Sequence, residues 1–485
     1  MRVPPVSVPR IAVIAAAGKG QRIHPRSTSV PKVMLEVGGK PLLSRQLELI
    51  RDALGIREVY IIVGYLADQI RDAYGDGTSF GVRLRYIDNP NVDQGLGSAL
   101  LVLEPHVQEP FVLLLGDELY LDTNHAALRD LPAGYVAACA LAPCEDLEVI
   151  RKNYSVTLAD GRITHLIEKP ESAPTPYVGC GTYVFSPEIY RDAHDTPLSP
   201  RSGRLELTDI IDHAAQRGGA VVPFILTGQY LNVNTIEDLN LANYLSRTQH
   251  FNQHRVSLVV PAYNEAAAIG HVMRDFRPHV DEIVVMDNCS PDGTARIAQE
   301  LGATVYSRPL RGYGDALQQG MDAATGDILV LVEADATFRA RDLGKLLEYL
   351  KDADMVIGTR TTRQMIEQGA NMDGLLRWGN VLVGKLVEGL WWAREPRFTD
   401  VGCTFRALWR DAYVKIRPYL TRHDATFSPE MMIEMLRVQA RVIEVPVSYY
   451  RRRGGASKHS ANRWHSIRTG LKMLRLILSK RLNLS

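Results

Sequence analysis

The sequence lacks any long apolar run. None of its 485 residues belongs to a stretch that reaches the roughly 18 consecutive apolar residues of a transmembrane helix. Residues 1–9 also lack the apolar core of a signal peptide. A strong excess of charge is missing too, because the formal net charge is only +1. No overall field draws such a chain to nucleic acid, so we expect no nucleic-acid partner.

Cysteine is scarce and scattered. The five cysteines form no Cys-x-x-Cys pair, and an odd, dispersed set is typical of reduced thiols in a cytoplasmic protein. The rest of the composition is ordinary for a globular chain, with 46% hydrophobic and 23% charged residues. The chain is too long for one hydrophobic core, so we expect two or three domains.

Apolar strands and amphipathic helices alternate in the first part of the chain. Strands are predicted at residues 11–16, 59–63, 84–87 and 111–115, and helices at 42–54, 67–74 and 98–103. This alternation favours an α/β fold with a mainly parallel sheet. Ligands of open α/β sheets bind at the carboxyl ends of the strands, so the residues that follow each strand are the first site candidates.

The first predicted strand runs into a loop of small residues and cations. The segment reads IAVIAAAGKGQR over residues 11–22, and Pro31 and Lys32 follow. Small residues let backbone N–H groups approach a phosphate, and cations neutralise its charge. A plain turn with surface cations is the alternative. We predict a nucleoside triphosphate site formed by Ala16, Gly18, Lys19, Gly20, Arg22 and Lys32.

Gly116 and Asp117 follow the strand predicted at residues 111–115, at its carboxyl end. A divalent cation bound to phosphates needs one or two protein oxygens, and an aspartate beside the triphosphate loop can supply one. A helix cap or a turn residue is the plainer alternative. We predict that Asp117 binds Mg²⁺ or Mn²⁺.

The loop resembles the signature loop of the sugar-phosphate nucleotidylyltransferases, and four later motifs strengthen the resemblance. They are QGLGS (94–98), IEKP (167–170), YVGCG (177–181) and ELTD (206–209). The resemblance implies catalytic roles for Arg22, Lys32, Asp117 and Lys169. It implies contacts to the nucleobase, the sugar or the sugar phosphate for Gln94, Gly95, Ser98, Glu168, Gly181 and Glu206.

The second metal ligand departs from the family pattern. Most relatives carry at least one aspartate where this chain reads LNVNTIEDL over residues 231–239. The resemblance favours Asn234 as the ligand, with Asn232 as the alternative. An amide oxygen can still bind Mg²⁺, but the lost negative charge predicts weaker metal binding and slow or absent nucleotidyl transfer.

A second α/β pattern follows a polar stretch, residues 246–255, that we predict to be a linker. A strand beginning at residue 256 breaks at Pro261 into PAYNE (261–265), and a second strand leads into DNCSPDGT (287–294). These motifs resemble family 2 inverting glycosyltransferases of the GT-A fold, most closely the dolichol- or polyprenyl-phosphate sugar synthases. The implied substrate contacts are Pro261, Tyr263, Glu265, Asp287 and Asp292.

The chemical centre of this second half is predicted at Glu333 and Asp335, in ILVLVEADAT (328–337). The family carries two aspartates there, which hold the divalent cation of the donor diphosphate. Strand alternation puts both side chains on one side of the strand end, so both can face one ion. The extra methylene of Glu333 is a change that flexible coordination can absorb. Solvated loop carboxylates are the alternative.

Residues further along resemble the acceptor site of the same synthases. In TDVGCTFR (399–406) the resemblance places Asp400 near the acceptor, as a catalytic residue, and Arg406 on the acceptor phosphate. Arg377 matches a second phosphate-binding arginine, and Lys458 lies in a loop that folds over phosphates. Arginine suits this role because its fork binds phosphate bidentately, although each could equally form a surface salt bridge.

The C-terminal segment is basic and amphipathic. Its apolar face comprises Trp464, Ile467, Leu471, Leu474, Leu478 and Leu482. The surrounding cations are Arg463, Arg468, Lys472, Arg475, Lys480 and Arg481. The pattern fits a helix lying on a membrane surface, and equally a helix packed on the domain core or at a dimer contact.

The sequence therefore predicts two tandem GT-A-like α/β domains with mixed, mainly parallel sheets. We expect a nucleotidylyltransferase domain at 1–245, a glycosyltransferase domain at 256–462 and a basic helix at 463–485. The expected enzyme makes a nucleotide-sugar from an NTP and a sugar phosphate, then transfers the glycosyl group to a polyprenyl-phosphate-like acceptor. The alternative is a glycosyltransferase with a soluble phosphorylated acceptor, in which the first domain is weakly active or only binds nucleotide.

Overall fold

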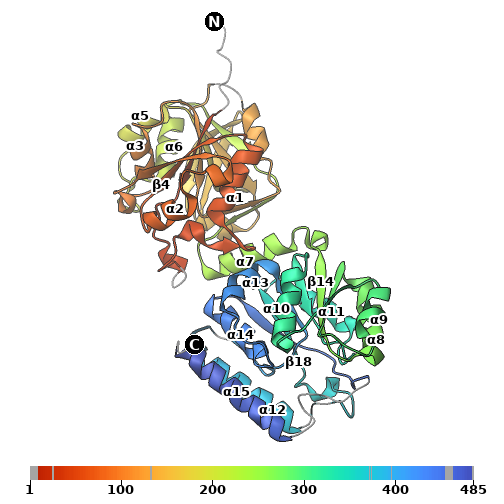
Figure 1. The fold of residues 1–485 in the computed structure, drawn as a ribbon. Coiled ribbons are helices and arrows are strands. Elements are labelled where there is room, and N and C mark those ends of the chain that lie inside the picture. Colours follow the sequence, from red (N-terminus) through yellow and green to blue (C-terminus); the bar gives the residue numbers. More distant parts are fainter. Residues whose placement is uncertain are drawn as a thin grey trace. The chain divides into compact units, whose positions relative to one another are not determined.

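The computed structural model describes residues 9–23, 27–131, 134–370, 372, 374–394, 396–453 and 463–482. The chain divides into two compact units, Met1–Ser246 and Arg247–Ser485, and each unit has its own seven-stranded sheet (Figure 1). Among the described residues, no helix combines the length and the apolar composition of a membrane span.

The main sheet of unit 1 has the strand order β12-β8-β11-β6-β1-β4-β5, and only β11 runs antiparallel to its neighbours. Its strands are β1 (Ile11–Ala15), β4 (Glu58–Val63), β5 (Arg83–Asp88), β6 (Phe111–Leu115), β8 (Ala137–Pro143), β11 (Tyr177–Phe185) and β12 (Val221–Ile225). Three two-stranded sheets pair β2 (Glu36–Val37) with β3 (Lys40–Pro41), β7 (Glu118–Leu121) with β13 (Gln229–Asn232), and β9 (Tyr154–Ala159) with β10 (Arg162–Glu168).

The helices of unit 1 confirm the predicted alternation. They are α1 (Leu42–Glu48), α2 (Ala67–Tyr74), α3 (Ser98–Leu103), α4 (Leu147–Lys152), α5 (Ile189–Asp195), α6 (Leu207–Gln216) and α7 (Ile236–Thr248). The helix predicted at 42–54 is α1 followed by one π-helical turn, Leu49–Ala53. Buried side chains cover both faces of the sheet, with Val13 of β1 in one cluster and Ile14 in the other, as strand alternation requires.

Unit 2 repeats this plan. Its sheet has the order β16-β15-β14-β17-β19-β18-β20, and only β19 is antiparallel. The strands are β14 (Val256–Ala262), β15 (Glu282–Asp287), β16 (Thr304–Ser307), β17 (Ile328–Leu331), β18 (Met355–Thr359), β19 (Arg406–Trp409) and β20 (Val442–Pro446). The helices are α8 (Ala266–Phe276), α9 (Thr294–Glu300), α10 (Tyr313–Ala323), α11 (Leu343–Leu350), α12 (Gly374–Leu390), α13 (Arg410–Ile416), α14 (Phe427–Arg437) and α15 (Arg463–Arg481).

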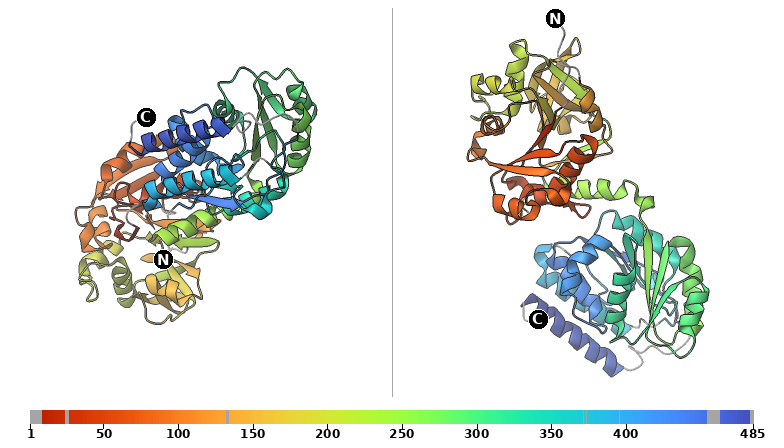
Figure 2. Two further views of the ribbon diagram at one scale, coloured as in Figure 1. Left: turned by 90° about the horizontal axis from the view of Figure 1, so that it is seen from below. Right: turned by 45° about the horizontal axis from the view of Figure 1, so that its top comes forward.

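The two main sheets have one topology. Numbered within its own sheet, each unit has the strand order 3-2-1-4-6-5-7, with the sixth strand antiparallel. Figure 2 shows helices on both sides of each sheet. The predicted fold class is therefore confirmed. The predicted metal carboxylates follow the fourth strand in both units, since Asp117 comes after β6 and Glu333 after β17.

The boundary between the two units lies at Ser246 and Arg247, inside the segment predicted as a linker. That segment is not irregular throughout, because α7 continues to Thr248 and the ring of Phe251 packs edge-on against Trp409, with centroids 6.0 Å apart.

One local prediction is wrong. Strand β14 does not break at Pro261, which keeps its place opposite Met286 in the parallel register. A proline nitrogen is tolerated here because the strand ends one residue later.

Candidate active sites

The structure brings four predicted residues of unit 1 together at the carboxyl end of β6. Nζ of Lys32 lies 2.5 Å from Oδ2 of Asp117 and 2.9 Å from Oδ1 of Asn234. The guanidinium of Arg22 donates to the same Asn234 oxygen over 2.8 Å. Two cationic side chains and two side-chain oxygens that could bind a metal thus meet at one point, although they come from segments far apart in the sequence.

Close packing fixes the backbone that carries Asp117. Gly116 donates its N–H to the carbonyl of Ala15 over 3.0 Å, and a Cβ on Gly116 would lie 2.5 Å from Cγ1 of Val33. The carbonyl of Asp117 accepts from the N–H of Val233 over 2.9 Å. Only glycine fits this turn, and the turn holds the aspartate next to the asparagine segment.

The donor set fits a divalent cation. Oδ2 of Asp117 and Oδ1 of Asn234 both contact the Lys32 ammonium, so both already face a positive charge. Oδ1 of Asn232 instead accepts from Nδ2 of Asn234 over 2.7 Å, which favours Asn234 as the ligand. The described residues hold no group of three or more His, Cys, Asp or Glu side chains placed for a metal. One carboxylate and one amide suffice when phosphate oxygens supply other ligands.

An ion pair connects the predicted phosphate loop to the segment that follows β5. Nζ of Lys19 lies 2.8 Å from Oδ2 of Asp93, and both side chains are exposed. Gly20 has a positive φ of 59°, which a glycine adopts without strain. Gly18 has open space where a side chain would stand, so a ligand can reach the loop backbone there. Ala16 is buried behind it.

One predicted nucleobase contact is wrong. Ser98 is buried, and its hydroxyl is used inside the loop, where it lies 2.7 Å from the carbonyl of Gly95 and 3.1 Å from that of Asn91. It organises the loop and does not face a ligand. Residue 95 must be a glycine, because its φ is 105° and a Cβ there would lie 2.3 Å from the carbonyl oxygen of Leu205. The carbonyl of Gln94 accepts the N–H of Leu205.

The predicted sugar-side residues gather around Lys169. This lysine has a positive φ of 49° and lines a surface hollow with Arg151, Pro170, Glu171 and Ser172. Burial raises the pKa of its neighbour Glu168, whose carboxylate accepts from Thr208 over 3.2 Å. Ser202 donates to Glu206 over 2.7 Å, so that carboxylate is oriented before any sugar binds.

Glu118 was missed by sequence analysis. Its carboxylate is buried beside Asp117 and accepts from the N–H of Gly181, one of the predicted sugar contacts. Burial and the nearby Asp117 charge raise the pKa of Glu118 to about 8. The only sequence signal was a second acidic residue directly after the Gly-Asp motif.

In unit 2, Asp335 is buried and Glu333 is half-buried in the loop after β17. Oε1 of Glu333 accepts from the hydroxyl of Thr404 over 2.6 Å, and Oδ1 of Asp335 accepts from the hydroxyl of Thr337 over 2.7 Å. Burial and the neighbouring Asp335 carboxylate raise the pKa of Glu333. Two adjacent carboxylates with little exposure to water favour a cation between them, as the metal prediction requires.

Arg452 was not predicted, yet it supplies positive charge at this centre. Its guanidinium lies 3.3 Å from Oδ2 of Asp335 and forms an ion pair with Glu265. Arg452 thereby connects Glu265, predicted to bind substrate, with Asp335. Three consecutive arginines in the sequence were the available signal, but they do not reveal which one points inward.

The predicted nucleotide-side aspartates are both hydrogen-bonded within the loop after β15. Oδ2 of the fully buried Asp287 accepts from Ser307 over 2.6 Å, while its Oδ1 has no partner among the described residues. Asp292 accepts from the N–H groups of Thr294 and Ala266, at the start of α9 and α8 respectively. Tyr263 is exposed at the edge of this loop.

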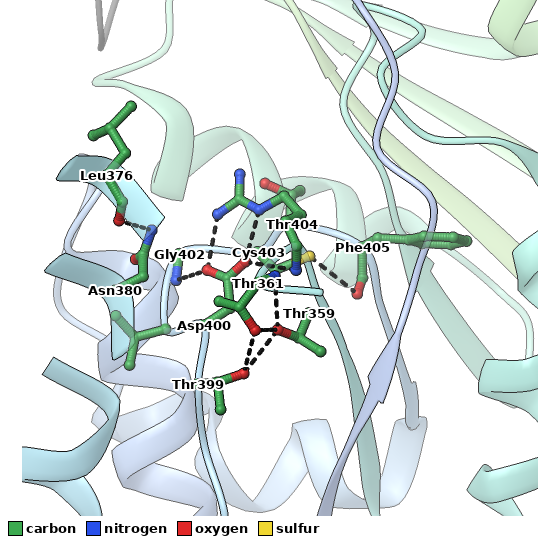
Figure 3. A network of polar contacts seen from close by, with 12 residues as sticks. Thr359, Thr361, Leu376, Asn380, Thr399, Asp400, Gly402, Cys403, Thr404 and Phe405 are labelled. Carbon is green, nitrogen blue, oxygen red and sulfur yellow. Dashed lines mark hydrogen bonds and ion pairs between the residues drawn. The ribbon is translucent and has the colours of Figure 1, made fainter. Parts of the chain in front are cut away.

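The prediction that Asp400 is a catalytic residue at the acceptor is wrong. Asp400 is fully buried, and Nε and Nη2 of Arg360 lie 2.8 and 2.9 Å from its two oxygens. Burial alone would raise the pKa of Asp400, but the Arg360 charge and hydrogen bonds hold it below its usual value. Figure 3 shows the N–H of Gly402 directed at this carboxylate, and the hydroxyls of Thr359, Thr361 and Thr399 in contact with one another. Asp400 organises the loop and cannot reach an acceptor.

The assignment of Arg406 to the acceptor phosphate is also wrong. Arg406 is 1% exposed, and its guanidinium donates to the carbonyls of Cys403, Ser428 and Val401. Arg377 lies in a half-buried position on α12. The loop that precedes Arg406 comes close to the same helix, since a Cβ on Gly402 would lie 3.3 Å from Asn380. Lys458 lies outside the described residues.

The C-terminal helix α15 packs on the core of unit 2 mainly with residues outside its predicted apolar face. Ile477, which was not assigned to that face, is fully buried, and of the predicted residues Leu474 packs against the same cluster. Lys480, predicted as a surface cation, is buried and lies 3.0 Å from Glu430 and 2.8 Å from Glu434 of α14. The leucines left exposed are Leu471, Leu478 and Leu482.

Comparison with known proteins matches the two units to two families. The nucleotidyl transferase family model matches residues 11–249, and the glycosyl transferase family 2 model matches residues 257–405. The chain is 34% identical over 228 residues to the UTP–glucose-1-phosphate uridylyltransferase AglF of Haloferax volcanii, which covers 47% of this chain and 92% of that protein.

Two other relatives match the same share of the chain. The low-salt glycan biosynthesis nucleotidyltransferase Agl11 of Haloferax volcanii is 31% identical, over 48% of this chain and 65% of its own length. A glucose-1-phosphate thymidylyltransferase of Streptomyces antibioticus is 28% identical, over 47% and 64%. The chain is therefore a member of the nucleotidyl transferase family that also carries a family 2 glycosyl transferase domain.

Proposed function

We propose that unit 1 makes a nucleotide-sugar from an NTP and a sugar 1-phosphate, and that unit 2 transfers the glycosyl group to a polyprenyl phosphate. The observation that carries the proposal is the repeated arrangement of the two sites. Each unit has its own carboxylates after the fourth strand of the same topology, so each can bind its own nucleotide substrate. The fused domains then share one intermediate.

In unit 1, Arg22 and Lys32 would bind the triphosphate while Lys169 holds the sugar phosphate. An oxygen of the sugar phosphate attacks the α-phosphorus of the NTP, and pyrophosphate leaves. Asp117 and Asn234 would hold Mg²⁺ or Mn²⁺, which neutralises charge on the triphosphate. Lys32 contacts both of these oxygens in the structure, so its ammonium must shift toward phosphate when substrates bind.

In unit 2, Asp400 is paired with Arg360 and is not available as a general base, so an acceptor that needs no deprotonation, such as a phosphate, fits this site. A phosphate monoester is already an oxyanion near neutral pH, so it can attack the anomeric carbon without losing a proton, and the nucleoside diphosphate leaves with inversion. The Asp400 carboxylate is held by Arg360 and takes no part in this step. Glu333 and Asp335 would hold the divalent cation at the donor diphosphate, and Arg377 would bind the acceptor phosphate.

A lipid acceptor is supported by the surface of two helices that lie side by side, α12 and α15 (Figure 1). Leu382 of α12 and Leu471 of α15 are 71% and 62% exposed, and Trp378 is exposed near Arg377. Exposed cations on α15 are Arg468, Lys472, Arg475 and Arg481. Helix α15 contains no acidic residue, so this mixed face suits an anionic membrane surface.

Two assays test the proposed function. Pyrophosphate release with UTP or dTTP and glucose 1-phosphate tests unit 1, and transfer from the matching nucleotide-sugar to polyprenyl phosphate tests unit 2. Vesicle co-sedimentation tests whether the surface formed by α12 and α15 binds membranes. The double variant L471S/L478S should bind phosphatidylglycerol vesicles less well, whereas V414S, on an exposed position of α13, should not change binding. Transfer only to water-soluble phosphorylated acceptors would refute the lipid acceptor. The cytoplasmic location and self-association stay predictions.

A further inference from the structure

The Glu118 side chain connects two parts of the unit 1 site. The residue begins β7, directly after Asp117, and its side chain points into the protein, where it is 2% exposed. The N–H of Gly181 lies 2.9 and 2.8 Å from its two carboxylate oxygens. The hydroxyl of Tyr230 donates to Oε1 over 2.7 Å, and the hydroxyl of Tyr120 donates to Oε2.

Strand β11 is irregular where Glu118 meets it. The strand pairs with β8 at residues 177–179 and again at 183–185, and its register shifts in between. Its pairing with β6 starts only at Thr182. Gly181 lies in this gap, so its N–H is paired with the Glu118 carboxylate and not with a neighbouring strand. The carboxylate satisfies a buried donor that would otherwise be costly.

The contact requires a glycine at residue 181. A Cβ on Gly181 would lie 2.7 Å from Cδ of Glu118 and 2.5 Å from Cγ of Leu115. The carboxylate therefore fills the space of the missing side chain, and the two residues fit only as a pair. Any shift of Glu118 moves this part of β11 with it.

The turn between β6 and β7 is also held from its other side. Gln46 of α1 is 1% exposed, and its Nε2 donates to the carbonyl of Leu115 over 2.6 Å and to that of Glu118 over 3.2 Å. These two carbonyls bracket Gly116 and Asp117. The backbone of the metal-binding aspartate is thus fixed to α1, and the next side chain along fixes β11 to the same turn.

We infer that Glu118 is a positioning residue that sets the sugar-binding strand, through Gly181, against the Asp117 turn that binds the triphosphate. The inference rests on the proposed function of unit 1, which places the sugar near Gly181 and the triphosphate near Asp117. Correct spacing of the two substrates is what brings the sugar phosphate within reach of the NTP. Unit 2 has a comparable link, since Thr404, just before its sixth strand, donates to Glu333 after its fourth.

The test compares E118D with E118Q and Y230F in the full chain. E118D shortens the side chain, so it cannot reach Gly181 and both tyrosines together. E118Q keeps an acceptor oxygen for the Gly181 N–H, and Y230F removes one hydroxyl but leaves that contact. We expect E118D to raise the KM for glucose 1-phosphate about 10-fold or more, because the hydrogen bond that fixes the Gly181 N–H is lost.

The dissociation constant for UTP, measured by calorimetry, should stay within about twofold in E118D, and E118Q and Y230F should stay close to the unchanged protein in both measurements. An equal loss of UTP and glucose 1-phosphate affinity in E118D would overturn the inference, because it would indicate general damage. An unchanged KM would also overturn it. If the unchanged protein released no pyrophosphate, the proposed function would fail, and calorimetry with glucose 1-phosphate would still compare the variants.

Discussion

Lys32 and Asp117 form a largely buried ion pair, with Nζ of the lysine 2.5 Å from Oδ2 of the aspartate. The same ammonium lies 2.9 Å from Oδ1 of Asn234. Both oxygens therefore face the lysine ammonium, and the Asn234 oxygen also faces Arg22. A metal ion at this point would release Lys32 toward the triphosphate, so metal and NTP binding should be strongly coupled in unit 1.

D117A should abolish pyrophosphate formation and leave transfer from supplied nucleotide-sugar unchanged, because unit 2 has its own carboxylates. The loss reflects both the missing ligand and the unpaired Lys32. Pyrophosphate release and glycosyl transfer are measured separately on the same preparation. D130A, which changes an exposed carboxylate of unit 1, is the control. Full pyrophosphate release by D117A would show that Asp117 is not required.

N234D should tighten Mn²⁺ binding to unit 1 several-fold, since a carboxylate replaces an amide beside Asp117. N232D should change it less, because Oδ1 of Asn232 faces the Asn234 amide and not Lys32. Calorimetric titration with Mn²⁺ in the presence of a non-hydrolysable NTP measures both. If neither variant changes the affinity, neither asparagine is a ligand.

R377A and R406A should fail in different ways. R377A should lower transfer to polyprenyl phosphate about 10- to 150-fold through a lost charge-assisted hydrogen bond, without lowering the thermal midpoint. R406A should lower the midpoint, because it leaves three buried carbonyls without their donor. Thermal unfolding and transfer rates distinguish the two. Loss of donor hydrolysis in R377A, equal to the loss of transfer, would point to a donor role.

His125 should make unit 1 less stable in mild acid. Burial lowers its pKa from 6.5 to about 4, and its ring nitrogens face the hydroxyls of Thr123 and Thr182. Below the ordinary pKa of histidine, His125 binds a proton in the unfolded chain but stays neutral in the folded chain. Stability is therefore full above that pKa and falls as the pH drops toward 4.

The expected loss from this histidine is about 2 kcal/mol between about pH 7 and pH 5. Urea unfolding of unit 1 at the two pH values measures it. H125Q should show a smaller dependence on pH, whereas H106Q, at an exposed position, should behave like the unchanged protein. Identical pH dependence in H125Q and H106Q would contradict the assignment.

Local patterns predicted the parts of the fold that depend on local sequence. Helices α2 and α3 and strand β6 have their predicted bounds, because apolar periodicity and turn residues are properties of short segments. Asp117 and Asp335 could be found for the same reason, since each lies within four residues of the end of an apolar strand. Motif resemblance supplied their chemistry, which periodicity alone does not contain.

Side-chain partners across the fold could not be read from the sequence. Arg406 and Lys480 are cations, so we expected both to be exposed. Instead, Arg406 donates to three backbone carbonyls, and Lys480 forms ion pairs with two glutamates. Arg360 was missed because its partner, Asp400, is 40 residues away in the sequence. Glu118 was missed because its role depends on a gap in strand β11, which only the assembled sheet shows.

The most direct test of the account is one coupled reaction. The full chain is incubated with UTP, radiolabelled glucose 1-phosphate, polyprenyl phosphate and Mg²⁺, and label is counted in the organic extract. We expect label in the lipid fraction with the unchanged protein and none with D117A unless UDP-glucose is added. D335A should instead accumulate water-soluble nucleotide-sugar. Lipid label formed by D117A without UDP-glucose, or no lipid label from the unchanged protein even when UDP-glucose is supplied, would contradict the account.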